Sequence, residues 1–128
     1  MNLTLVDNEP KFYEFIRELR LHPENINGFT NQNYFTEEEQ NKYMEKNEKH
    51  YKICLKGTLP VGFVGVIDGD IRVATKPEFK GMGIGKFMIN EIMKTYPNSF
   101  AKIKINNESS IKLFESCDFE IKYIIMER

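Results

Sequence analysis

The apolar positions of the chain change period near residue 50, from helical spacing before it to strand alternation after it. Leu3 and Leu5 lie on either side of Thr4, which predicts a short strand. From residue 12 to residue 19, apolar side chains recur three or four positions apart and predict a helix. That helix should end before Pro23, because proline disfavours helical geometry in the preceding residue. The polar residues 24–35, rich in Asn, then predict a loop.

A second helix is predicted to begin after Thr36 and to run to about residue 48. Thr36 and Glu39 have the spacing of a capping box, in which the threonine closes the first amides and the glutamate reaches back. Only Tyr43 and Met44 give this helix an apolar face. We therefore expect it to pack at the periphery, where it can shape the mouth of a substrate site.

The second half of the chain predicts an antiparallel meander followed by alternating helices and strands. Alternation predicts strands at 51–55, 61–67 and 70–75. Asp68-Gly69 is the strongest hairpin signal, since both residues tolerate the positive φ that the turn requires. Further helices are predicted at 84–95 and 107–117, and further strands at 102–105 and 120–126.

Together these elements predict one α+β domain over residues 1–128. The expected order is β-α-α-β-β-β-α-β-α-β, with a central, mostly antiparallel sheet of about six strands flanked by about four helices. A chain of 128 residues is long enough for one such core and too short for two.

Composition narrows the classes of partner. The net charge of −1 provides no global positive field for nucleic acid or an anionic membrane surface. No apolar run approaches the ~20 residues that span a bilayer, and the N-terminus lacks a signal-peptide pattern, so we expect a cytoplasmic protein. Cys54 and Cys117 each lie in an apolar-periodic segment, which favours reduced core thiols over a disulfide or a metal site.

The segment with the clearest chemistry is the glycine-rich stretch between the strand at 70–75 and the helix at 84–95. Glycines at 81, 83 and 85 leave backbone amides unobstructed at a helix N-terminus, which favours an anion such as a pyrophosphate. Lys80 and Lys86 either add charge to this loop or are ordinary surface lysines.

Two other phosphate loops do not fit this stretch. The P-loop motif requires four residues between its glycines and a Ser or Thr after the lysine, whereas three residues separate Gly81 from Gly85 and Phe87 follows Lys86. The spacing also departs from the dinucleotide fingerprint. A purely structural turn is the remaining alternative.

Two motifs together resemble the GNAT acyltransferases. Lys80-Gly81-Met82-Gly83-Ile84-Gly85 is similar to the basic-x-x-G-x-G/A pyrophosphate loop of that family. Residues 107–119 follow its N-x-x-A-x-x-L-Y-x-x-x-G-F pattern in register, and the resemblance covers roughly residues 60–125. It implies an acetyl-CoA-dependent N-acetyltransferase that acts on a primary amine of a small molecule or peptide, without a metal, as a monomer or homodimer. Residues 19–38 also resemble small N-acetyltransferases of nucleotide-linked amino sugars.

The resemblance assigns roles to particular residues. The strands at 71–75 and 102–105 should splay apart, and the pantetheine arm should pair with backbone groups of Val73 and Thr75. Asn107 should hydrogen-bond to the pantetheine or help to order the splayed strand, and an ordinary helix cap is an alternative that excludes neither role. The full set of residues expected to bind the cofactor is Val73, Thr75, Lys80, Gly81, Met82, Gly83, Ile84, Gly85, Lys86, Asn107, Ser110 and Phe114.

The catalytic acid and base are where the sequence departs from the family pattern. Phe114 stands where many relatives carry a tyrosine that could protonate the departing thiolate, which leaves water as a candidate acid. Asp118 replaces a glycine at a site expected to need left-handed geometry. Asp70 is the first candidate base and Tyr123 the second, against the alternatives of a hairpin residue and a half-buried aromatic.

Two other classes of function remain open from sequence. A non-catalytic acyl-CoA-binding module of the same fold would explain the missing acid. An interaction protein would use the glycine loop for structure alone.

Overall fold

Four strands form one antiparallel sheet in which neighbours in sequence are neighbours in space. They stand in the order β1 (Leu3–Asp7), β2 (Tyr51–Lys56), β3 (Leu59–Ile67) and β4 (Asp70–Thr75). The computed structural model describes residues 2–26, 29 and 34–128. The predicted hairpin between β3 and β4 is confirmed, with φ of 51° at Asp68 and 82° at Gly69.

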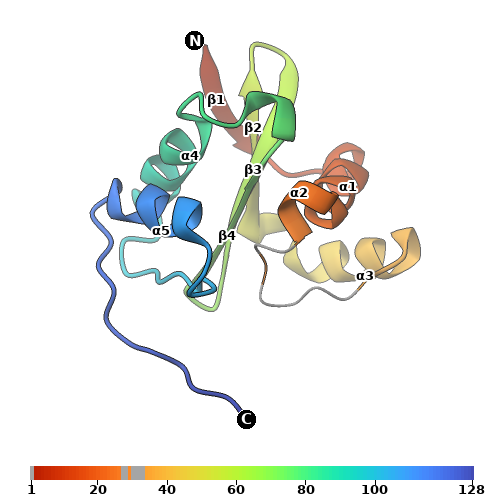
Figure 1. Cartoon of the computed structure of the whole chain (residues 1–128). Helices are drawn as coiled ribbons and strands as arrows, with labels where there is room; N and C mark the ends of the chain where they lie inside the picture. The colour runs from red at the N-terminus through yellow and green to blue at the C-terminus, as the bar shows by residue number, and fades with distance from the viewer. Residues whose placement is uncertain (1, 27–28, 30–33) are drawn as a thin grey trace.

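Helices cover both faces of this sheet (Figure 1). On one side lie α1 (Tyr13–Leu21), α2 (Pro23–Ile26) and α3 (Glu37–Asn47). On the other lie α4 (Ile84–Met93) and α5 (Glu108–Glu115). Short 3₁₀ turns precede α1, β2 and the glycine loop, at Pro10–Phe12, Glu48–His50 and Pro77–Phe79. The α+β class is thus confirmed, with five α-helices in the described residues where about four were expected.

Two hydrophobic clusters, one on each side of the sheet, form the core. The cluster under α4 and α5 includes Cys54, Val61, Val64, Val66, Ile71, Ile84, Met88, Ile89, Ile92, Phe114 and Cys117. The cluster under α1 and α3 includes Phe12, Tyr13, Ile16, Leu19, Met44, Tyr51, Ile53, Phe63 and Ala74. Both cysteines are free and buried, as predicted, and burial raises the pKa of the Cys54 thiol to about 11.

The predicted start and stop signals of the helices agree with the structure. Thr36 and Glu39 form both bonds of the capping box, at 3.1 Å and 2.9 Å. His22 ends α1 in an extended conformation before Pro23. Pro23 itself begins α2, so residues 23–26 of the predicted loop are helical, since proline suits the first helical turn. Residues 27–28 and 30–33 of that loop lie outside the described residues.

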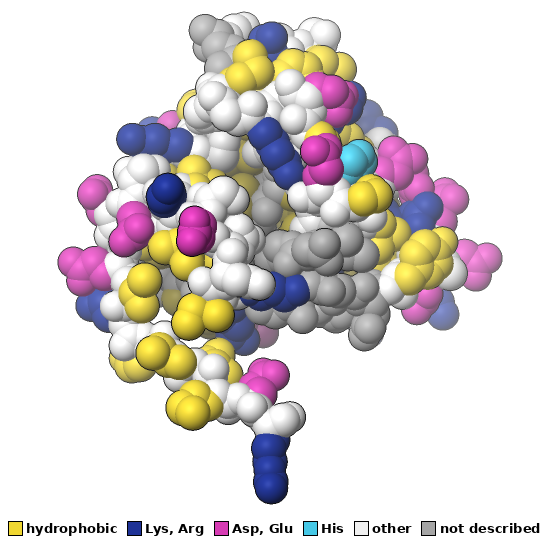
Figure 2. Space-filling view, in the orientation of Figure 1, with side chains coloured by type: hydrophobic (Ala, Val, Ile, Leu, Met, Phe, Trp, Pro, Cys, Tyr) yellow, Lys and Arg dark blue, Asp and Glu magenta, His cyan; other side chains and the backbone are white. Residues whose placement is uncertain are grey.

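Two of the six predicted strands are absent from the described residues. The segment 102–105 runs as a loop. The chain bonds to the neighbouring β4 at Phe100 and makes no ladder with it after that residue in the described structure. The segment 120–126 has no partner strand and extends away from the domain as a tail, with exposed fractions of 89% at Tyr123 and 71% at Ile125 (Figure 2). Alternation identifies residues that can form a strand, but a strand also needs a neighbouring edge to bond.

Met88→Ala should lower the free energy of unfolding by about 2–5 kcal/mol, because Met88 is fully buried between α4 and the sheet and its removal leaves a cavity. The matched control is Met126→Ala on the exposed tail, which should change stability by less than about 0.5 kcal/mol. Urea unfolding followed by circular dichroism measures both. Equal effects of the two substitutions would contradict this packing.

Candidate functional site

The outer edge of β4 has backbone groups that bond to no other strand in the described residues. Lys76 N–H donates to Val61 on β3 at 2.7 Å, whereas Ile71 N–H donates outward to Phe100 at 2.9 Å. Because alternate residues of an antiparallel strand bond to opposite sides, Val73 and Thr75 direct their backbone groups away from β3. In Figure 1, this strand runs up the middle of the molecule, between α5 and α2.

The chain beside β4 starts paired and then separates from it. Phe100 bonds to β4 and its turn through Ile71 N–H and through its own N–H to Gly69, at 2.9 Å and 2.8 Å. Beyond this single parallel bridge, the segment that follows Phe100 makes no further pairing with β4 in the described residues. The expected separation of 71–75 from 102–105 is therefore present, although it lies between a strand and a loop.

The open edge leads into the glycine loop at the N-terminus of α4. Gly81 and Gly83 both have φ of 81°, and Gly83 is the N-cap residue without a side-chain cap. Since Phe87 N–H makes the first helical bond, to Gly83, the amides of residues 84–86 have no intrahelical acceptor. A Cβ atom at Gly81 or Gly83 would meet nothing within 4 Å, so the loop presents an open backbone surface that suits an anion.

The other residues of the loop differ in which of their atoms a ligand can reach. The Ile84 side chain is buried in the core, so only its amide can contact a ligand. A Cβ atom at Gly85 would lie 3.0 Å from Leu113 of α5, which indicates a packing role for this glycine. Met82 and Lys86 are exposed. Lys80 Nζ donates to the Glu24 carbonyl of α2 at 3.1 Å and so connects the loop to the helices of the other face.

The residues predicted from the second motif lie on α5. The Asn107 side chain accepts a hydrogen bond from Ser110 N–H at 3.2 Å. Asn107 is therefore the N-cap of α5, which was one of the roles considered from the sequence. Phe114 is buried and packs edge-on against Phe119, with ring centroids 5.1 Å apart. Asp118 has φ of 68°, which confirms the predicted left-handed geometry.

The two candidate bases lie in different environments. Asp70 begins β4 and is half-buried. Its side chain alternates to the same face as Ala74, which belongs to the core under α1 and α3. Tyr123 lies on the tail with 89% of its surface exposed, and no hydrogen bond joins it to the rest of the described chain. The structure therefore brings Asp70, and not Tyr123, to the strand with the open edge.

A polar cluster that the sequence did not reveal lies on the same face as Asp70. Arg20, Tyr43, Tyr51 and Arg72 line a small cavity between α1, α3 and the sheet, together with Phe29 and the buried Ile16, Gln40, Met44 and Phe63. The hydroxyls of Tyr43 and Tyr51 lie 2.7 Å apart, and Arg72 donates to Tyr43 at 3.1 Å. The alternation of β4 does indicate the direction of the Arg72 side chain, because residues 72 and 74 of a strand lie on the same face of the sheet.

Burial determines the ionisation of this cluster. It lowers the pKa of the Arg20 guanidinium, and the charge of Arg72 acts in the same direction. Burial also raises the pKa of Tyr51, with Tyr43 adding to the effect. For Arg72, burial lowers the pKa, but Tyr51, Tyr43 and Asp70 more than offset it. Near neutral pH both guanidinium groups of the cluster are cations.

Asn25 is a second residue that the sequence did not reveal. Its buried side chain donates to the Leu19 carbonyl at 2.9 Å and to the Thr75 carbonyl at 3.4 Å. These two hydrogen bonds connect the turn between α1 and α2 to the end of β4. The Thr75 carbonyl is engaged, and its N–H remains directed to the open edge.

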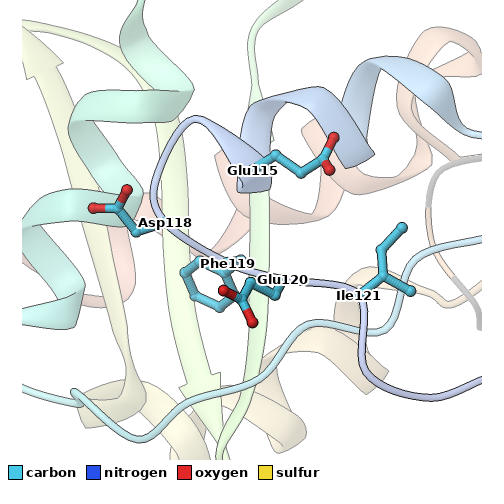
Figure 3. Close-up of a pocket in the computed structure, with 5 residues that line it drawn as sticks. All are labelled: Glu115, Asp118, Phe119, Glu120 and Ile121. Atoms are coloured by element: carbon cyan, nitrogen blue, oxygen red, sulfur yellow. The ribbon is translucent and has the colours of Figure 1, made fainter.

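A larger hollow, of about 400 Å³, lies where α5 meets the tail (Figure 3). Its lining residues are Glu115, Asp118, Phe119, Glu120 and Ile121. Three of these five are carboxylates, so the hollow repels a pyrophosphate. Within the described residues, no three His, Cys, Asp or Glu side chains gather to hold a metal ion. None of the helices described is long and apolar enough to cross a bilayer.

Several solved structures share this fold. The spermidine N-acetyltransferase of Vibrio cholerae, in complex with CoA and spermine, matches with a TM-score of 0.82 and 19% identity, over 98% of this chain and 85% of its own. A domain from Methanocaldococcus jannaschii matches with a TM-score of 0.80 and 23% identity, over 93% and 88% of the two chains. A phosphinothricin acetyltransferase from Sinorhizobium meliloti, in complex with acetyl-CoA, matches with a TM-score of 0.80 and 19% identity, over 96% and 77%.

By sequence, the chain matches a protein family and no individual curated protein. No curated protein matches the chain significantly by sequence. The model of the acetyltransferase (GNAT) family matches residues 12–119, which include β2, β3, β4, the glycine loop and α5. Because this match spans most of the chain, the protein belongs to the GNAT family of acetyltransferases.

Proposed function

We propose that this protein transfers the acetyl group of acetyl-CoA to a primary amine of a small molecule or peptide. The observation that carries the proposal is the continuity of the open β4 edge with the uncapped N-terminus of α4. The amides of residues 84–86 would hold the pyrophosphate, and Val73 and Thr75 would pair with the pantetheine arm. Family membership and the CoA complex of the Vibrio enzyme support this assignment.

In the proposed reaction, the neutral amine nitrogen attacks the thioester carbonyl. A carbon–nitrogen bond forms, the carbon–sulfur bond breaks with its electron pair leaving on sulfur, and the ammonium proton is lost to a base. An outward N–H of β4 would stabilise the developing oxyanion, a contribution of roughly 3 kcal/mol per donor. The CoA thiolate leaves tolerably near neutral pH, so water can protonate it without an acid at position 114.

Asp70 is the proposed base. It is half-buried at the head of β4, on the face where the acceptor would approach the thioester. The buried, free cysteines are consistent with the reducing cytoplasm, which we propose as the location.

The direct test is release of free CoA thiol from acetyl-CoA in the presence of a panel of amino sugars, nucleotide sugars, amino acids and polyamines. We expect thiol release that depends on both protein and amine. Tight CoA binding in calorimetry without turnover of any amine would instead favour the acyl-CoA-binding module. Absence of CoA binding would favour the interaction protein.

Gly83→Ala should weaken CoA binding at least about 10-fold, because a methyl group would project from the backbone surface that the pyrophosphate approaches. Alanine is preferred to valine, since a β-branched side chain at φ of 81° would add strain of its own. Gly57→Ala is the matched control, because Gly57 also has positive φ and open space but lies in the β2–β3 turn. If both variants bind CoA as the wild type does in calorimetry, the loop assignment is wrong.

Asp70→Asn should reduce the acetyl-transfer rate at neutral pH about 10²-fold or more, while stability changes by less than about 1 kcal/mol. Asparagine keeps the size of the side chain and its compatibility with the turn. The loss should shrink at high pH, where the amine deprotonates by itself. Rates measured from pH 6 to pH 10 test this, and an unchanged rate at neutral pH would dismiss Asp70 as the base.

A further inference from the structure

The cluster of Arg20 and Arg72 has more positive charge than its surroundings balance. No carboxylate lies within 4.0 Å of either guanidinium in the described part of the chain. Residues 1, 27–28 and 30–33 contain no Asp or Glu, so they cannot supply a carboxylate. Asp70 acts on Arg72 only from beyond ion-pair distance. By contrast, Arg17, one turn before Arg20, is paired with Glu14 at 2.6 Å.

Aromatic rings and tyrosine hydroxyls hold the two cations in place. The Arg20 guanidinium lies over the rings of Phe29 and Phe35, 5.3 Å and 5.4 Å from their centroids. Arg72 bonds to the hydroxyls of Tyr43 and Tyr51, whereas a guanidinium has five N–H donors. Two half-buried cations near each other are unfavourable unless an anion joins them.

The position of the cluster connects it to the proposed chemistry. Arg72 immediately precedes Val73, whose backbone groups face the open edge. Its side chain projects to the face of α1 and α3, whereas α4 and α5 lie on the opposite face. An anion bound to the arginines would therefore lie one residue along the strand from Val73, which we propose as a contact of the pantetheine arm.

We propose that Arg20 and Arg72 bind an anionic group, carboxylate or phosphate, of the amine acceptor. That the anion belongs to an amine acceptor rests on the proposed function, but the anion site itself can be tested without acetyl transfer. The cavity lined by the cluster has a volume of about 10 Å³, the room of one water. An oxygen of the anionic group would fill it, while the rest of the acceptor extends toward Val73.

The inference separates this protein from the polyamine enzyme whose fold it shares. Spermine and spermidine have only positive charges, and two unpaired guanidiniums would repel them. An amine with a carboxylate or phosphate would instead form charge-assisted, bidentate contacts with the arginines. The acceptor is thus an anionic amine.

The first test measures anion binding alone, as the shift in melting temperature caused by sodium phosphate or sodium acetate relative to sodium chloride at constant ionic strength. We expect a rise for the wild type that Arg20→Gln and Arg72→Gln reduce, while the part of the rise that comes from anions at the glycine loop remains. Arg17→Gln should retain the full rise, since Arg17 is already paired with Glu14. The comparison of phosphate with acetate distinguishes the two sources of anion.

The two glutamine variants should fold, because each removes one of two unpaired cations. Without added anion their melting temperatures should equal or exceed that of the wild type. No shift in the wild type, or a shift of the same size in the wild type and in both variants, would overturn the inference.

The second test compares acceptors that differ by one anionic group, L-lysine with cadaverine and O-phosphoethanolamine with ethanolamine. The anionic member of at least one pair should have a kcat/KM roughly 10- to 100-fold higher, from the worth of hydrogen bonds to a charged group. Arg72→Gln should remove that preference mainly through KM. A preference for cadaverine and ethanolamine would overturn the inference.

The two tests separate failure of the inference from failure of the proposed function. If the arginine variants reduce the anion shift but no amine is acetylated, the anion site stands and acetyl transfer fails. If amines are acetylated without discrimination by charge, acetyl transfer stands and the inference fails.

Discussion

The outer edge of β4 is the constraint on which the rest of the site depends. A strand edge with unpaired N–H and C=O groups must be bonded to something, and in most proteins another strand does this. Here Phe100 occupies only the start of the edge, and Asn25 engages one carbonyl at its end. The remaining groups, at Val73 and Thr75, lie between the two helical layers and lead to the glycine loop. An extended, amide-bearing arm such as the pantetheine that we propose has the hydrogen-bonding groups that such an edge can receive.

Sequence predicted those parts of the structure that depend on neighbours in the chain. The Asp68-Gly69 hairpin, the Thr36 capping box and the left-handed Asp118 are each determined by a few consecutive residues, so local chemistry was sufficient. The glycine loop was predicted for the same reason, because three alternate glycines before an apolar helix leave few other structures. The structure adds that Gly85 differs from Gly81 and Gly83, since it packs against Leu113.

Features that depend on distant partners were missed or wrong. The segment 120–126 alternates as a strand should, but no edge in the described chain receives it, and its apolar side chains extend along the tail (Figure 2). The arginine cluster unites residues from α1, α3, β2 and β4, which no local pattern could bring together. The charge selectivity that we propose depends on the same long-range packing, because it holds two cations beside β4.

Amide hydrogen exchange of β4, followed by NMR with and without CoA, tests the central claim most directly. In the free protein, the amides of Val73 and Thr75 should exchange faster than those of Arg72 and Ala74, which bond to β3. Saturating CoA should slow exchange at Val73, Thr75 and the first residues of α4. Exchange at Val73 and Thr75 that CoA leaves unchanged, while CoA is bound, would contradict the assignment of the β4 edge as the pantetheine site.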